Sequence, residues 1–331
     1  MPDHGGMTIR PVPGMPLPEI VRVARQCVID EAEALRSALE DFSQAPRPGS
    51  PSELDGKAWS EDVGPCARDR GALLGLTQQQ AMLTYVNAYD HMWSLGRLLG
   101  ADGAMSLFSH QSASRVACEA AVRFAWLMDP DISSEKRITR GAVALVNSAE
   151  ERVRGVRRLS ADRCPPGVLD TMIKNCNSER ENVRALITRA GIAFGRSRKG
   201  TTENRLVIAA ANISVALTVK AGDLMAELLP DSPSWYNIGS AVTHSVFWGL
   251  RDVVQSRPGE PLDLLPDVME VGAAAESAIS ASALILDRCG RYYGHDPRSQ
   301  VQRAQEHREK IDALMRRAAT STWAQLPVWR P

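Results

Sequence analysis

Apolar side chains recur every three or four residues along most of this chain, which is the spacing of one face of an α-helix. The clearest example is the run over 77–99. Its apolar residues share one helical face: Met82, Tyr85, Val86, Tyr89 and Trp93. Thr77 and Gln80 have the spacing of a capping box, and Gly100 follows the run, so the helix is expected to begin at Thr77 and end near Gly100.

The same periodicity predicts helices over 17–42, 104–128, 132–159, 167–190, 221–229, 232–254, 266–289 and 297–319. The interval 192–220 differs, because its segments LVIAA and SVALTV have the composition of strands. The predicted fold class is therefore all-α, a multi-helix bundle of about eight or nine helices that allows for one small β-hairpin near 192–220.

A change of composition follows the first helix, where SQAPRPGSPSELDGKAW is rich in Pro, Gly and Ser. Such a stretch is typical of a linker or a long loop. We therefore expect a mobile N-terminus over 1–57, made of one arm helix and this linker. A single helical-bundle domain is expected over 76–319, followed by a tail over 320–331.

Composition narrows the classes of partner. Of the 331 residues, 44% are hydrophobic and only 5% aromatic, so Ala, Leu and Val must fill the core. Lys and Arg number 39, as do Asp and Glu, and a net charge of zero gives no chain-wide attraction to nucleic acid or anionic membrane. Basic stretches over 133–163 and 189–205 leave RNA binding open.

The six cysteines are scattered and form no C-x-x-C pair, which favours reduced thiols. The N-terminus has no apolar stretch of signal-peptide length. The longest uncharged run in a clearly apolar predicted helix, Ser277–Leu286, is too short to span a membrane. We expect a soluble cytoplasmic protein with no membrane partner. The Ala- and Ser-rich helix over 266–289 is compatible with a homodimer.

One polar row crosses the helix that is otherwise apolar nearly all round and therefore expected to be buried. Its members are four residues apart on one face: Gln111, Arg115, Glu119 and Arg123. Buried charges are stable only when they are paired or hydrated. The row is thus either an internal Arg–Glu network or the lining of a ligand-binding cleft.

A second polar row follows the predicted helix over 232–254. Its members fall within about a quarter turn of one face: Asn237, Ser240, His244, Trp248 and Arg251. Because the imidazole group titrates near neutral pH, His244 could act as an acid, a base or a ligand. The alternative is a hydrogen-bonded core histidine. We take His244, Asn237, Ser240 and Arg251 as candidate catalytic residues, and Trp248 as a candidate ligand-binding residue together with the first row.

Several cofactor classes lack their signatures in this sequence. No Glu-x-x-His pairs of a di-iron bundle occur, nor a phosphate-binding loop, a dinucleotide-binding glycine motif or a nucleophile elbow. We therefore expect no metal and no cofactor.

Two stretches of the chain resemble known families. RVACEAAVRFAWLMDPDISSEKRITR and SPSWYNIGSAVTHSVFWGL resemble uncharacterised helical proteins of actinobacteria over most of 76–317, and those proteins carry no activity to transfer. The second stretch also resembles HEPN domains, some of which are metal-independent ribonucleases with an Arg, a polar residue and a His. Asn237 and His244 match the last two, Tyr236 stands at the arginine position, and the gap to His244 is one residue too long.

Three functions follow as hypotheses. The first is a helical bundle, with regulation as one role open to it, that binds a small molecule or a protein partner through a polar cleft between helices. The second is a HEPN-like ribonuclease of a toxin or defence system that uses His244, with Arg251 or Arg115 in place of the missing arginine. The third is a cofactor-free helical biosynthetic enzyme. The first two require the Arg115 and His244 rows to share one water-accessible hollow.

Overall fold

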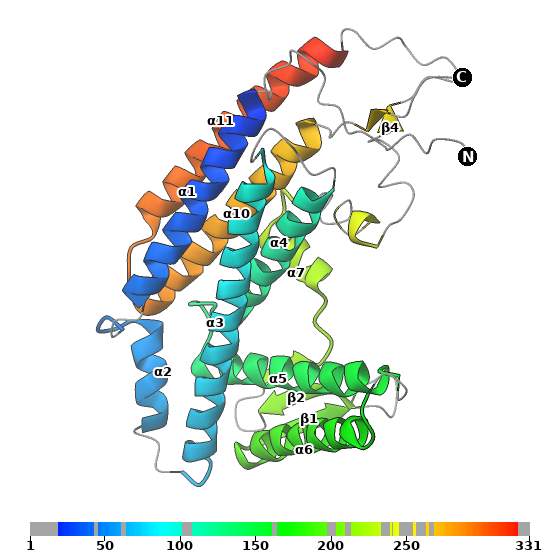
Figure 1. Cartoon of the computed structure of the whole chain (residues 1–331). Helices are drawn as coiled ribbons and strands as arrows, with labels where there is room; N and C mark the ends of the chain where they lie inside the picture. The colour runs from blue at the N-terminus through cyan, green and yellow to red at the C-terminus, as the bar shows by residue number, and fades with distance from the viewer. Residues whose placement is uncertain are drawn as a thin grey trace, which may run out of the picture.

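A computed structural model describes residues 19–42, 46–60, 64–100, 108–160, 164–196, 203–208, 213–232, 239, 241–244, 254–255, 263–264 and 268–323. Figure 1 shows a bundle of long helices from which a smaller helical layer with a sheet extends at one end. This arrangement confirms the predicted all-α fold.

The bounds of the helices are α1 Glu19–Phe42, α2 Pro51–Ser60, α3 Ala67–Leu98, α4 Ser109–Leu127, α5 Ser134–Arg157, α6 Val168–Arg189, α7 Ala221–Leu228, α10 Val268–Tyr293 and α11 Arg298–Trp323. Most of the helices coincide with an apolar period of 3.6 residues in the sequence; α2 and the first turns of α3 do not. The helix expected over 232–254 lies mostly outside the described residues, within which 239 and 241–243 are helical.

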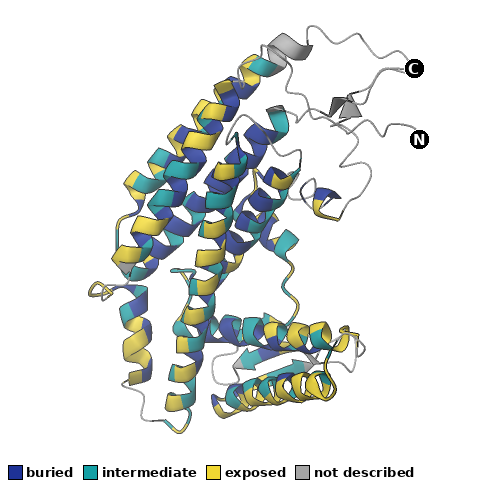
Figure 2. Cartoon of the chain, viewed as in Figure 1, coloured by how far each residue is buried: buried dark blue, intermediate teal, exposed yellow. Residues whose placement is uncertain are grey.

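The main core lies between α1, α4, α10, α11 and the second half of α3 (Figure 1). Helix α10 runs through its centre and buries a row of small side chains: Ala273, Ala275, Ala278 and Ala281. Alanine at these positions lets α1, α4 and α11 approach closely, so close packing replaces large aromatic groups. Figure 2 shows the buried faces of these helices turned toward one another.

The N-terminal helix is not the separate arm that we predicted. Val28, Ala32 and Leu35 of α1 are fully buried in the main core, where α1 packs on α3, α10 and α11. The segment predicted as a linker also folds, because residues 51–60 form α2 and Trp59 is buried. Only the periodicity of α1 was visible in the sequence, whereas two of its partners, α10 and α11, lie more than two hundred residues away.

A second, smaller core joins the first half of α3 to α5, α6 and a sheet. The expected hairpin is in fact three antiparallel strands in the order β1-β2-β3: Ile192–Arg196, Glu203–Ile208 and Ile213–Ala216. Leu206 in the middle strand pairs with Phe194 and Val215, and it is fully buried toward α5. Two further short strands, β4 Val254–Gln255 and β5 Asp263–Leu264, pair with each other.

Helix α3 is long enough to contribute to both cores. It starts ten residues earlier than the sequence predicted. Thr77, the expected N-cap, lies inside the helix, and its hydroxyl donates to the carbonyl of Leu73 at 2.7 Å. The capping-box prediction was therefore wrong. A serine cap does begin α5, where Ser133 accepts from the backbone N–H of Lys136.

A buried ion pair ties the two cores together. Arg137 of α5 is fully buried and contacts the carboxylate of Asp55 on α2 at 2.9 Å. The hydroxyl of Tyr292 on α10 donates to the same carboxylate at 2.9 Å, and the Arg137 guanidinium lies 4.8 Å from the centre of the Tyr292 ring. A buried charge of this kind is stable because it has partners of opposite charge and hydrogen-bonding groups around it.

Helix α10 is long and apolar enough to cross a membrane by length and composition alone, over Met269–Tyr293. Most of that stretch is buried inside the protein. The central helix of a helical bundle has the same length and composition.

Candidate functional site

Most side chains of the first predicted row contact another polar side chain, on α10 or within α4. Gln111 is buried, and its amide donates to the carboxylate of Glu270 on α10. Arg115 and Glu119 form an ion pair at 2.8 Å, with side chains 14% and 24% exposed. Arg123 is exposed one turn further on. Of the internal Arg–Glu network that we weighed as one interpretation, this one ion pair within α4 is present among the described contacts.

The second row lies partly outside the described residues, which include His244 but not Asn237, Ser240, Trp248 and Arg251. His244 is exposed and follows a short helical turn. That turn packs on α4, because a Cβ atom at Gly239 would lie 3.1 Å from Cβ of Arg115. The hydroxyls of Thr243 and Ser112 are 3.2 Å apart. The segment that carries His244 thus borders the start of the first row.

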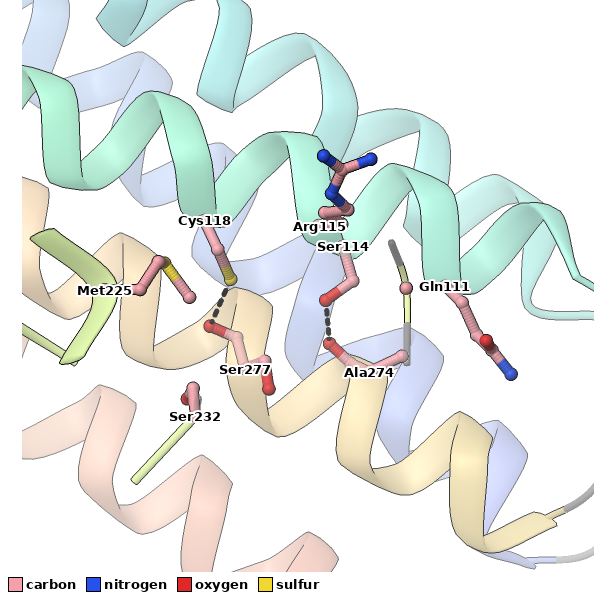
Figure 3. A pocket seen from close by; sticks show the side chains of 9 residues that line it. Gln111, Ser114, Arg115, Cys118, Met225, Ser232, Ala274 and Ser277 are labelled. Atoms are coloured by element: carbon pink, nitrogen blue, oxygen red, sulfur yellow. Dashed lines mark hydrogen bonds between the residues drawn. The ribbon is translucent and has the colours of Figure 1, made fainter. Parts of the chain in front are cut away.

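The hollow between these segments is small (Figure 3). It is lined by Gln111, Ser114, Arg115, Cys118, Met225, Ser232, Gly239, Ala274 and Ser277. Ser114 and Cys118 of α4 donate to the carbonyls of Ala274 and Ser277 on α10, at 2.6 and 3.4 Å. The cavity measures about 10 Å³, which is room for one water molecule at most.

The side chains that line this hollow are also unreactive. Burial raises the pKa of the Cys118 thiol to about 12, so the sulfur is a neutral thiol at physiological pH. In Figure 3 the guanidinium group of Arg115 points away from α10, and the aliphatic part of the side chain lines the cavity. The hollow therefore offers neither a thiolate nor space for an organic ligand.

A different polar cluster lies between α1, α10 and α11, and we did not predict it from the sequence. Glu31 of α1 is fully buried. Its carboxylate accepts hydrogen bonds from Arg303 Nε at 2.9 Å, from His307 Nδ1 at 2.9 Å and from Ser282 Oγ at 3.1 Å. One buried carboxylate thus holds side chains from two other helices.

The electrostatics of this cluster favour an ionised Glu31. Burial alone would raise the pKa of its carboxyl group, but hydrogen bonds from His307 and Arg303 outweigh burial and hold the pKa below its ordinary value. Glu31 is therefore a carboxylate at neutral pH. Its contact with Nδ1 fixes the orientation of the His307 ring.

His307 forms part of the wall of an open groove of about 740 Å³. The groove runs between α1, α11 and the end of α3, and it is lined by Val21, Arg22, Val23, Arg25, Gln26, Cys27, Asp30, Leu99, Gly100, His307 and Lys310. Of the apolar side chains that line it, Val23 is partly exposed, whereas Val21 and Leu99 are each 1% exposed and offer almost no surface. Arg22, Arg25 and Lys310 are exposed, so three cations border the groove.

Two further groups in the groove limit its chemistry. Asp30 lies 4.0 Å from Nε2 of His307, so the imidazole ring stands between two carboxylates. Burial raises the pKa of the Cys27 thiol to about 11, although nearby Lys310 opposes the change. The groove can therefore bind and orient a charged ligand through His307 and the cations, whereas Cys27 is not an activated nucleophile.

A signal for this cluster exists in the sequence. Glu31 stands on the apolar face of the first helix, four residues from both Cys27 and Leu35. His307 likewise stands between Ala304 and Ile311 on the buried face of α11. A carboxylate and a histidine on two apolar faces indicate a buried pair, but nothing local shows that two faces 276 residues apart meet.

Within the described parts of the chain, no group of three or more His, Cys, Asp or Glu side chains is placed to hold a metal ion. No protein-family model matches the chain, and no curated protein or solved structure is significantly similar to it.

Proposed function

We propose that this protein binds a small amphiphilic anion in the groove between α1, α11 and the end of α3. The single observation that carries the proposal is the position of His307. This histidine is 7% exposed, is oriented by buried Glu31, and lies in the wall of a groove bordered by Arg22, Arg25 and Lys310. Ordered polar groups that converge on a concave apolar surface are typical of small-molecule sites.

The groove has the size and the charge that such a ligand requires. Its volume of about 740 Å³ lies within the range of small-molecule pockets, about 300–1,000 Å³. The exposed cations Arg22 and Arg25 stand one turn apart on α1, so both can reach one carboxylate or phosphate group. The partly exposed side chain of Val23 in the lining suits a short hydrocarbon part of the ligand.

The proposal keeps the hypothesis of a ligand-binding bundle but moves its site. The hollow beside Arg115 has room for one water molecule at most, whereas the groove beside His307 is far larger. A regulatory role would fit a protein in which α1 and α11, distant in sequence, both line the binding site.

Calorimetric titration with three short probes tests the proposal. Octanoate has the anionic head and the tail, acetate has the head alone, and octyltrimethylammonium has the tail with a cation. Octanoate is expected to bind most tightly. The double variant Arg22→Gln/Arg25→Gln is expected to weaken octanoate binding by about tenfold or more, because two charged hydrogen-bond donors are lost.

Arg36→Gln is the matched control, because Arg36 is an exposed arginine of the same helix that pairs with Glu33 at 2.7 Å outside the groove. It is expected to bind octanoate like the wild type. Equal binding of octanoate and octyltrimethylammonium would refute the proposal, as would an equal loss in Arg36→Gln.

The ribonuclease and biosynthetic-enzyme hypotheses stay predictions. The first depends on His244 together with Asn237, Ser240 and Arg251, and three of these four residues lie outside the described parts of the chain. Expression of the wild type and of His244→Ala, followed by growth measurement and analysis of total RNA, separates this hypothesis from ligand binding. Intact RNA with the wild type would exclude it.

A further inference from the structure

The turn between α5 and α6 exposes an unusual group of apolar side chains. Leu159 is 45% exposed just after α5, and Val168 and Met172 are 41% and 37% exposed on the first turns of α6. Val168 and Met172 are four residues apart and share one face of α6. Half of the large apolar side chains that are clearly exposed among the described residues thus lie at this one turn.

The two helices are antiparallel neighbours, so these side chains lie at one end of a pair. Arg152 of α5 contacts Glu179 of α6 at 2.7 Å, and Glu150 lies 3.7 Å from Arg180. In these contacts the residue numbers decrease along α5 as they increase along α6, so the two helices run antiparallel. Figure 2 shows exposed residues along the outer face of α6 and at the end of α5.

The same end carries an excess of positive charge. Arg157 and Arg158 are exposed at the end of α5, whereas the exposed Arg154 pairs with Glu151 at 2.9 Å. Lys174 is exposed on α6 but lies ~200° around the helix from Met172. Over 154–160 and 164–174, Asp170 is the one carboxylate that the structure describes. Farther along the pair, by contrast, Glu150 and Glu179 neutralise arginines.

We propose that this tip, defined as Leu159, Val168 and Met172 with Arg157 and Arg158, docks on an anionic lipid surface. The three apolar side chains would enter the headgroup boundary, and the two arginines would contact lipid phosphates. Apolar side chains beside cations are the combination by which peripheral proteins attach to anionic membranes. The expectation of no membrane partner was based on the zero net charge of the whole chain and on the lack of an apolar run long enough to span a membrane. Neither property registers a local surface patch of this kind.

The composition of the tip favours lipid over the other partners of a basic patch. Single-stranded RNA is held by aromatic side chains on which bases stack, and the tip offers two aliphatic groups and a thioether. A stable protein interface buries about 800 Å² on each partner. Three side chains that are each less than half exposed supply too little apolar area for that.

Cosedimentation of the full chain with lipid vesicles tests the proposal. Two compositions are compared, phosphatidylcholine alone and phosphatidylcholine with phosphatidylglycerol. The protein is expected to bind only the anionic vesicles, and less at high salt. Arg157→Gln/Arg158→Gln is expected to weaken partitioning about 25-fold, because each cation near such a surface contributes a factor of about five.

Leu159→Ser/Met172→Ser is expected to weaken partitioning about tenfold, because it removes the apolar groups that enter the boundary. Leu83→Ser is the matched control, because Leu83 is 64% exposed on α3 and lies outside the tip. Circular dichroism verifies that each variant is folded.

Four results would overturn the proposal: no sedimentation with either vesicle, equal sedimentation with both, a loss in Leu83→Ser as large as in the tip variants, or tighter binding of single-stranded RNA than of anionic vesicles. These measurements are independent of the groove, so the proposed function and this inference can fail separately.

Discussion

Replacing Glu31 by glutamine tests whether the buried cluster between α1, α10 and α11 stabilises the fold. The variant keeps the shape of the side chain and removes its charge. An amide nitrogen then faces Arg303 and His307, which are donors to the carboxylate at 2.9 Å each in the wild type. The substitution therefore places donor against donor in a site that is fully buried.

We expect the variant to lose about 3 kcal/mol of unfolding free energy. Removing one partner of a buried ion pair costs about 3–5 kcal/mol, because the remaining charge has no compensation. The lower end applies here, since Arg303 is 37% exposed and water can hydrate its guanidinium group. Urea unfolding followed by circular dichroism at 222 nm measures the difference.

The pH dependence of that difference identifies the charge as its cause. Because the folded state lowers the pKa of Glu31, the stabilisation is present above the pKa of the unfolded state and is lost as pH falls through the folded pKa. The gap between wild type and variant should be full at pH 7 and should narrow below about pH 4.

Glu33→Gln is the matched control on the same helix. Glu33 is 40% exposed and pairs with Arg36 on the surface, so its loss should change stability by less than about 1 kcal/mol. Our reasoning would be refuted if Glu31→Gln were as stable as this control, or if its deficit were the same at pH 3.5 and pH 7.

Three further predictions concern other buried groups. Asp55→Ala should destabilise the protein by about 3 kcal/mol or more in urea unfolding, because Arg137 is left charged and buried, and adding Arg137→Met should recover part of the loss. Burial, with a smaller effect of Asp312, raises the pKa of Glu276 to about 7. The free energy of unfolding therefore falls as pH rises toward that value. Glu276→Gln should raise the melting temperature more at pH 8 than at pH 5. Of the six thiols, only Cys66 and Cys164 are not buried, so a thiol reagent added to the native protein should modify two groups rapidly, whereas six fast groups would contradict the structure.

The sequence predicts those parts of the fold that depend on the pattern of residues within one helix. Except for α2, which lies in the predicted linker, the helices were predictable because each buries one face. The period of 3.6 residues survives whatever covers that face. The start of α3 was predicted ten residues late. Its first turns bury little more than Leu73 and Leu74, which leaves too few apolar positions to establish a period.

The candidate site was less predictable, for a different physical reason. A row of polar side chains on one helix, such as Gln111 to Arg123, shows that a polar environment is needed but not whether a neighbour or solvent supplies it. Here Glu270 of α10 contacts Gln111, and Arg115 contacts Glu119 within α4. The groove beside His307 depends on how α1 meets α11, which no local pattern specifies.

The crossing of α3 and α5 provides the last test, because it joins the two cores. A Cβ atom at Gly141 of α5 would lie 1.7 Å from Oγ1 and 2.7 Å from Cγ2 of Thr77, a buried residue of α3. Gly141→Ala gains about 1 kcal/mol of helix propensity in principle. The overlap should reverse that gain, since forcing a methyl group into a packed core costs about 1–3 kcal/mol.

We therefore expect Gly141→Ala to lower the melting temperature, and Thr77→Ala in the same chain to restore part of it by removing Oγ1 and Cγ2. Gly155→Ala is the matched control on α5, because a Cβ atom there meets nothing within 4 Å and only the propensity gain remains. If calorimetry found Gly141→Ala as stable as Gly155→Ala, the two helices could not cross as closely as Gly141 and Thr77 indicate. The attachment of the smaller core to the bundle would then need another explanation.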